Sequence, residues 1–232
     1  EAGKALARPL YDWGLAAQFR DVNRDGLPDL YVCNDLGSPD RVWLGEGQGR
    51  FRALPRWAVR KTSWFSMGVD FGDLNRDGID DFLVTDMLSR NWVQRQVERA
   101  AREAEPEPFL GSEARPQSAR NTLFVGRGNG TFAEIAWAAG IAASDWSWSP
   151  VFLDVDLDGY EDVLITTGFS RNVQDVDVAE EIEAIRQRDK LSDAASLELR
   201  RRFPSLAQPN LAFRNRGDLT FAENRSEERR VG

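Results

Sequence analysis

Asp21-Val22-Asn23-Arg24-Asp25-Gly26-Leu27-Pro28-Asp29 is the first of three copies of one acidic pattern in this chain of 232 residues. The other two copies occupy residues 73–81 (DLNRDGIDD) and 154–162 (DVDLDGYED). In each copy, oxygen-bearing side chains fill positions 1, 3, 5 and 9, and glycine fills position 6. Carboxylates crowded into so short a segment repel one another unless a cation lies between them. Calcium, which takes about six to eight hard oxygen ligands, is the predicted cation.

An EF-hand loop begins with the same spacing of oxygen ligands, but it requires a glutamate at position 12. Here position 12 is Val32, Val84 or Ile165, inside an apolar run that starts directly after each loop. These runs are rich in β-branched and aromatic residues, which is typical of buried strands. The sequence therefore predicts strand–loop–strand units rather than helix pairs. Asp-rich β-turns that bind no metal are the alternative, because aspartate and asparagine favour turns in any case.

Each loop is predicted to bind one Ca²⁺ ion, about three ions in all. Side-chain oxygens are expected from positions 1, 3, 5 and 9, and a backbone carbonyl from position 7. Glycine at position 6 permits the sharp turn. The predicted ligands are Asp21, Asn23, Asp25, Leu27, Asp29, Asp73, Asn75, Asp77, Ile79, Asp81, Asp154, Asp156, Asp158, Tyr160 and Asp162.

A second element, in which an apolar segment, a Gly-rich turn and a phenylalanine follow one another, also recurs. It occupies residues 42–51 and 123–132, with a weaker copy at 211–221. Apolar residues on both sides of a short Gly/Asn/Asp turn predict a β-hairpin. Two longer segments, about 88–118 and 175–208, separate the loops from the later hairpins. Their mixture of charged and apolar residues predicts helical insertions into a repeated β unit.

Aromatic residues recur upstream of each acidic loop. Alignment of the loops places six of them at two equivalent positions: Phe19, Phe71 and Phe152, and further upstream Trp13, Phe65 and Trp146. Large aromatic side chains at matching positions of a repeat are expected to pack between neighbouring sheets.

Composition excludes several classes of function. The net charge is −8 with no basic stripe, so nucleic acid is not an expected partner. The chain has no histidine, which excludes histidine general bases, and its one cysteine, Cys33, is predicted to be a buried strand residue. No apolar run approaches the roughly 18 residues of a membrane span, so membrane insertion is not expected.

The acidic loops, with a phenylalanine before and an apolar strand after, resemble the FG-GAP or VCBS repeat of integrin-α-like β-propellers. The hairpin at 121–132 and the segment 145–148 are similar to bacterial relatives of cartilage acidic protein. The resemblance covers most of residues 10–224 and implies an all-β ring of about seven four-stranded blades. This chain would then be a fragment of about three to four blades with two helical insertions. The resemblance also implies structural calcium at the ligands given above, and a secreted, periplasmic or cell-surface location.

The expected domain organisation is one propeller unit, residues 1–224, completed by the remaining blades of a parent chain. Residues 225–232 resemble the translated read-through of a sequencing adaptor and are expected to be a non-native tail.

The predicted function is that of a non-catalytic, calcium-stabilised scaffold that binds an extracellular protein or glycan, for example in adhesion. The acids Glu46, Glu134 and Glu223 are scattered and form no recognisable catalytic pair. The alternative is the propeller part of a calcium-dependent polysaccharide-active enzyme, a lyase or a glycosidase.

Overall fold

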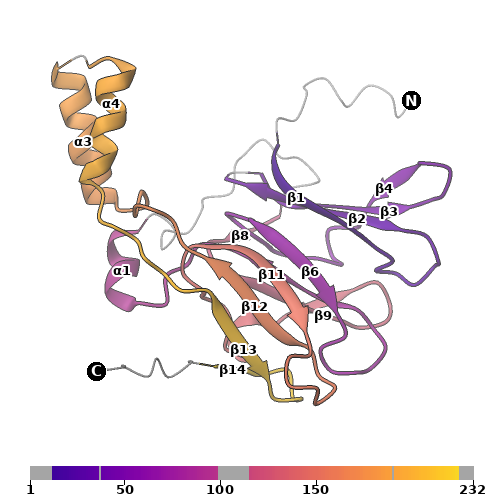
Figure 1. Ribbon diagram of the computed structural model, residues 1–232. Coiled ribbons are helices and arrows are strands. Elements are labelled where there is room, and N and C mark those ends of the chain that lie inside the picture. Colours follow the sequence, from indigo (N-terminus) through magenta and orange to yellow (C-terminus); the bar gives the residue numbers. More distant parts are fainter. Residues whose placement is uncertain (1–11, 37, 99–114, 190, 225–232) are drawn as a thin grey trace, which may run out of the picture.

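The computed structural model describes residues 12–36, 38–98, 115–189 and 191–224. Most strands belong to three four-stranded antiparallel sheets in which strands adjacent in the chain pair with each other (Figure 1). The first sheet consists of β1 (Trp13–Arg20), β2 (Asp29–Asp35), β3 (Arg41–Gly45) and β4 (Phe51–Ala53). The middle sheet consists of β6 (Gly68–Gly72), β7 (Asp81–Thr85), β9 (Thr122–Gly126) and β10 (Phe132–Glu134). The third sheet consists of β11 (Ser147–Leu153), β12 (Asp162–Thr167), β13 (Leu211–Asn215) and β14 (Phe221–Glu223).

The three sheets repeat one local plan. In each, the predicted acidic loop joins the first two strands, and the predicted hairpin forms the last two strands. The hairpins at β3–β4, β9–β10 and β13–β14 confirm the interpretation of the Gly-rich turns, since each turn contains residues with positive φ such as Gly49, Gly130 and Gly217. The repeated pattern of the sequence therefore corresponds to a repeated four-stranded sheet.

All described helices except the one-turn α2 lie in the connections between the second and third strands of the middle and third sheets. The first connection contains α1 (Trp92–Val97) and the short strand β8 (Gln117–Ser118), which pairs in parallel with β5 (Thr62–Ser63); residues 99–114 lie outside the described residues. The second contains α3 (Val176–Asp189), α4 (Asp193–Leu199) and a 3₁₀ turn (Arg200–Arg202). Figure 1 shows α3 and α4 side by side, projecting away from the sheets. A one-turn helix, α2 (Ala136–Ala139), follows β10.

Two apolar layers hold the sheets together. Tyr31 and Cys33 of the first sheet pack with Phe71, Phe82 and Val84 of the middle sheet. On the opposite side of the middle sheet, a second cluster combines residues of the middle and third sheets, among them Leu74, Leu83, Leu123, Phe152, Val163, Ile165 and Phe213. Each sheet thus presents equivalent positions to its neighbour. The burial of Cys33 agrees with the sequence prediction.

The recurring aromatic residues are buried in the later copies but not in the first. Phe71, Phe152, Phe65 and Trp146 are all buried, as predicted. Trp13 is 64% exposed and Phe19 is 60% exposed, so the prediction of core packing is wrong for the first copy. The reason is the order of the sheets: among the described residues, no sheet covers the outer face of the first one.

No helix among the described residues is both long and apolar enough to cross a membrane. The proposed tail, residues 225–232, lies outside the described residues.

Two buried carboxyl groups have raised pKa values, which predict that the protein becomes less stable as the pH rises. Asp40 accepts hydrogen bonds from Tyr31 Oη (2.6 Å) and Asn34 N (2.9 Å), and Asp86 accepts from the backbone of Trp64 and Phe65 (2.9 Å each). Burial nevertheless raises the pKa of Asp40 to about 6 and that of Asp86 to about 7. An unfolded aspartate has a pKa of about 3.9, so the folded chain holds these protons more tightly. The resulting stabilisation is complete below about pH 4 and is lost as the pH rises through about 6 and 7.

In the presence of EDTA, the melting temperature is therefore expected to be lower at pH 8 than at pH 5. The change Asp40→Asn should reduce this difference, because asparagine keeps an acceptor for Asn34 N but does not titrate. Thermal unfolding followed by circular dichroism at both pH values measures it. A melting temperature that rises between pH 5 and pH 8 would contradict the assignment.

Candidate metal centre

Each acidic loop folds around its own side chains. In the first loop, the carboxylate of Asp21 accepts hydrogen bonds from Asp25 N (3.1 Å) and Gly26 N (2.8 Å). Asp25 in turn accepts from Leu27 N (2.9 Å). The same bonds recur in the second loop from Asp73 and Asp77, and in the third from Asp154 and Asp158. Positions 1 and 5 therefore fix the turn, with their carboxylates directed into the loop.

Two positions of each loop have left-handed backbone conformation. The predicted glycine at position 6 has φ of 83° in Gly26, 78° in Gly78 and 91° in Gly159. Position 4 also has positive φ, although it is Arg24, Arg76 or Leu157. The left-handed conformation of position 4 could not be predicted, because these residue types do not favour that region.

Position 9 fastens each loop to the third strand of its sheet. The buried Asp81 accepts hydrogen bonds from Leu74 N (3.1 Å) within the loop and from Gly126 N (2.9 Å) at the end of β9. Asp29 makes the same pair of bonds with Val22 N and Gly45 N, and Asp162 with Val155 N and Asn215 N. The assignment of position 9 as a metal ligand stays a prediction, and so does the assignment of the backbone carbonyls of Leu27, Ile79 and Tyr160.

Glycine at the end of the third strand allows this close approach. A side chain at Gly45 would place its Cβ 2.4 Å from the carbonyl oxygen of Pro28, and one at Gly126 would place it 2.5 Å from that of Asp80. The third sheet has Asn215 instead, and its amide donates a hydrogen bond to the equivalent carbonyl of Glu161 (3.1 Å).

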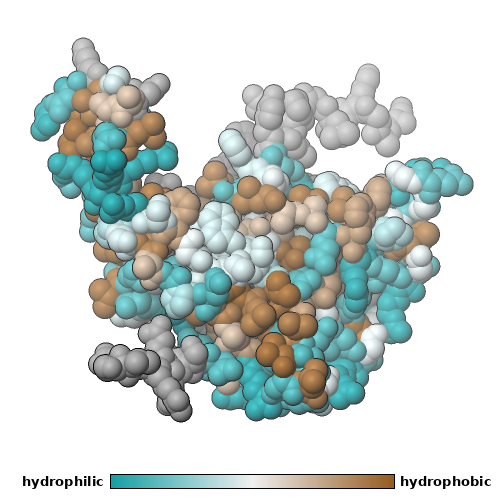
Figure 2. All heavy atoms as spheres, in the orientation of Figure 1, coloured by the Kyte–Doolittle hydropathy of each residue, from teal (hydrophilic) through white to brown (hydrophobic). Residues whose placement is uncertain are grey.

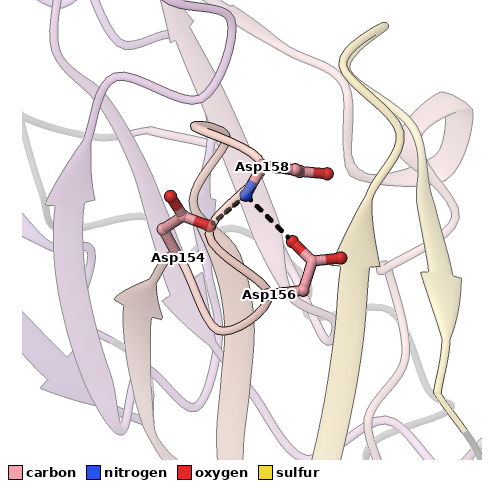
Figure 3. Close-up of side chains that lie close together, drawn as sticks. All are labelled: Asp154, Asp156 and Asp158. Atoms are coloured by element: carbon pink, nitrogen blue, oxygen red, sulfur yellow. Dashed lines mark hydrogen bonds between the residues drawn. The ribbon is translucent and has the colours of Figure 1, made fainter.

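The third loop brings three carboxylates together. One ligand atom from each of Asp154, Asp156 and Asp158 lies within 4.8 Å of the others (Figure 3), and within the described part of the chain this is the one place where three acidic side chains come so close. Arg214 on β13 approaches Asp156 (2.8 Å) and Asp158 (3.1 Å). The backbone N–H of Tyr160 and then the Arg214 guanidinium hold the pKa of Asp158 below its ordinary value.

In the first two loops, position 3 is asparagine, and the side-chain amide lies between the acids. Asn23 Nδ2 donates to Asp25, and Asn75 Nδ2 donates to Asp77, at 2.9 Å in both loops. All three loops offer only oxygen ligands beside exposed carboxylates, which is the donor set of a hard divalent cation. The residues therefore fit calcium best in the third loop, where Arg214 now partly neutralises the site.

The loops also contact one another. Arg20, just before the first loop, forms an ion pair with Asp80 of the second (2.5 Å), and Glu161 of the third loop accepts a hydrogen bond from Asp73 N of the second (2.9 Å). The Arg76 guanidinium lies 5.4 Å from the ring centre of Tyr160 in the third loop. Neither these bridges nor Arg214 could be recognised in the sequence, because each joins residues that are distant in the chain.

Comparison with known proteins agrees with the repeated loops. The family model of the FG-GAP-like repeat matches residues 21–84 and 110–165, more than half of the chain. No curated protein matches. Among solved structures, the chain is similar to an Agrocybe aegerita lectin that specifically recognises non-reducing terminal N-acetylglucosamine, with a TM-score of 0.39 and 13% identity. The match covers 89% of this chain and 36% of the lectin chain.

The family match begins at Asp21 and ends at Ile165, so it includes all three acidic loops. These loops share one hydrogen-bond pattern and occupy the same place in three like sheets. The chain belongs to the FG-GAP-like repeat family.

Proposed function

We propose that this chain is part of a calcium-stabilised β-propeller that binds extracellular glycan or protein ligands and catalyses no reaction. The observation that carries the proposal is the repetition of one sheet and one acidic loop, with the loops in contact along a shared edge. Propellers are built from four-stranded antiparallel sheets arranged around an axis.

The first strands of the three sheets support this arrangement, because they meet at one residue. Asp70 on β6 accepts hydrogen bonds from Gln18 Nε2 on β1 (3.2 Å) and from Phe152 N on β11 (2.8 Å). Three first strands held side by side are expected of the inner strands of neighbouring blades.

The outer faces of the two end sheets are apolar, which supports further blades on both sides. Phe19 and Phe51 are exposed on the first sheet, with ring centres 6.4 Å apart. On the third sheet, Val151 and Leu153 of β11 are exposed, and Figure 2 shows hydrophobic side chains gathered over this strand. Monomeric proteins seldom leave such patches open, so we propose that additional sheets of the same kind cover both faces.

Calcium would be held in the third loop by Asp154, Asp156 and Asp158, and by the corresponding motif positions in the other loops. The ion would relieve carboxylate repulsion and stiffen the edge where the loops touch. At a hundredfold excess over Kd, each ion would add about 2.7 kcal/mol to the free energy of unfolding. Calcium sites of extracellular modules have Kd values of about 10⁻⁴ to 10⁻³ M, which fits a secreted, periplasmic or cell-surface protein.

The change Asp158→Asn tests calcium binding with little disturbance of the loop. Asparagine keeps the oxygen that accepts Tyr160 N (3.0 Å) but removes one charge from the site. Calcium affinity, measured by titration calorimetry, is expected to fall about tenfold, and the calcium-induced rise in melting temperature should shrink accordingly. In EDTA the variant should melt within a few degrees of the unmodified protein.

Asp218→Asn is the matched control. Asp218 is also exposed and also accepts a backbone N–H two residues ahead, from Thr220 (3.0 Å), but it lies in the β13–β14 turn. It should leave calcium affinity unchanged. Equal effects of the two changes, or no calcium-induced stabilisation of the unmodified protein, would contradict the proposed ion.

The absence of catalysis is proposed from the state of the acids that an enzyme would need. Glu46, Glu134 and Glu223 each form an ion pair with a different arginine, respectively Arg52, Arg120 and Arg90. A glycosidase general acid must carry a proton, whereas each of these carboxylates has a cationic partner. Release of reducing ends or of unsaturated products from polysaccharides in calcium would favour the polysaccharide-active enzyme instead.

A further inference from the structure

A polar cleft lies beside α1, away from the acidic loops. Its volume is about 580 Å³, and its walls come from the start of α1, the turn before β11, residues 205–209 and β14. A second hollow of about 260 Å³ adjoins it and shares Arg90 and Glu223. Trp137 of α2 and Arg95 of α1 line this second hollow.

Ion pairs build the floor of the cleft. Arg90 Nε donates to Asp145 Oδ2 (2.7 Å), and Arg90 Nη1 donates to Glu223 Oε1 (2.6 Å). Asp145 is buried, and its other oxygen accepts the backbone N–H of Arg90 (2.7 Å). Asp145 also has a left-handed backbone, φ 60°, which is unusual for a residue other than glycine. Three segments far apart in the chain are thus fixed around one arginine before any ligand arrives.

Across the two hollows, the formal charges of Arg90 and Arg95 balance those of Asp145 and Glu223. At Arg90, an anionic ligand would have to displace Asp145 or Glu223, and a cationic ligand would have to displace Arg90 from both acids. A neutral polyhydroxylated ligand does neither, because hydroxyl groups can use the lone pairs and N–H groups that the ion pairs leave available. The side-chain amides of Gln94 and Gln208 line the walls, where their oxygens accept hydrogen bonds from Ser89 Oγ (3.1 Å) and Trp146 N (3.2 Å). Each amide is therefore held in place and can offer its nitrogen as a donor.

Trp137 supplies an apolar platform next to these polar groups. Its side chain is 59% exposed, and the guanidinium groups of Arg95 and Arg120 lie 5.9 and 5.8 Å from its ring centre. The same hollow contains the ion-paired Arg90 and Glu223. An exposed indole beside such hydrogen-bonding groups matches the two faces of a sugar ring, one apolar with C–H groups and one edged with hydroxyls.

We infer that this cleft is a binding site for a neutral oligosaccharide, with Trp137 stacking on a sugar ring and Arg90, Glu223 and Gln94 bonding to its hydroxyls. The inference rests on the proposed function, and it specifies both the ligand class and the place where it binds.

The experiment measures binding of cellohexaose, maltohexaose and chitohexaose, with an oligogalacturonate of equal length as the anionic probe. Binding is measured by calorimetry in about 1 mM calcium, the upper end of the Kd range of extracellular calcium sites. At least one neutral hexasaccharide should bind better than the anionic probe. Trp137→Ala should weaken that binding by roughly tenfold or more. Trp57→Ala is the matched control, because Trp57 is 60% exposed and lines neither hollow; it should bind as the unmodified protein does.

A second variant tests the charge argument. Glu223→Gln leaves Arg90 with one carboxylate partner, so it should lower the preference for neutral over anionic saccharide. Thermal unfolding confirms that each variant is folded. Equal binding by the Trp137→Ala and Trp57→Ala variants, or tighter binding of oligogalacturonate by the unmodified protein, would overturn the site.

Different results would contradict the cleft as the binding site and glycan binding by the protein as a whole. If the protein binds saccharides but Trp137→Ala has no effect, the cleft is wrong while a glycan-binding scaffold stands. If the protein binds no immobilised glycan on an array and calcium does not stabilise it, the proposed function fails as well.

Discussion

Replacing Phe82 by alanine is expected to lower the free energy of unfolding by about 3–5 kcal/mol, enough to unfold a marginally stable domain. Phe82 is 1% exposed and lies at the centre of the layer between the first and middle sheets. Its ring centre is 4.6–5.2 Å from those of four other aromatic residues: Phe124, Phe132, Phe71 and Tyr31. Alanine would leave a cavity at this position. The surrounding rings could fill it only if the strands that carry them moved.

Phe51→Ala is the control for this prediction, since Phe51 is exposed on the outer face of the first sheet. Its effect should stay below about 1 kcal/mol. Urea unfolding of both variants, with calcium and with EDTA, gives the free energies directly. Similar losses for the two changes would mean that the sheets do not pack through Phe82.

Asp81→Ala is expected to destabilise the protein by roughly 2–5 kcal/mol whether or not calcium is present. Removal of its carboxylate leaves Leu74 N and Gly126 N without their acceptor in a buried place. These bonds tie the second loop to β9, so the middle sheet should loosen where the loop leaves it. The expected loss of stability thus comes from the two backbone N–H groups that remain buried without an acceptor. It does not depend on a bound ion.

Asp77→Ala provides the comparison within the same loop. Asp77 is exposed and accepts hydrogen bonds from Ile79 N (2.8 Å) and Asn75 Nδ2 (2.9 Å), both within the loop. Its loss should be about 1 kcal/mol in EDTA and larger in calcium, if position 5 is a ligand. Melting curves of both variants under both conditions separate the structural role of position 9 from metal binding. A loss for Asp81→Ala that appears only in calcium would assign position 9 to the ion instead.

The loops and hairpins were predictable because short segments determine them. Asp21, Asp25 and Gly26 make their contacts within one loop, so the order of residue types is enough to specify the turn. The strands that follow the loops were equally predictable from their apolar residues, such as Phe82 and Ile165. The third hairpin has a weaker sequence pattern, because Asn215 replaces the glycine there. Its side-chain amide instead donates a hydrogen bond to the carbonyl of Glu161.

What the sequence could not provide were contacts between distant segments. The exposure of Trp13 and Phe19 depends on whether another sheet covers them, and this cannot be predicted from the residue type alone. Arg214 reaches the third loop, and Arg90 joins Asp145 to Glu223, only because strands distant in the chain lie side by side. In the sequence each of these residues is an ordinary charged residue, so neither the Arg214 contacts of the third loop nor the cleft beside α1 could be predicted.

The stacking of the sheets has a consequence for how such a chain could have originated. Phe71 and Phe82 face the preceding sheet, and their counterparts Phe152 and Val163 do the same one sheet later. A duplicated stretch of DNA that encodes one sheet would arrive with both of its packing surfaces already matched to its new neighbours. Lengthening by whole modules would then require no simultaneous change elsewhere, whereas addition of half a module would misalign every layer after it.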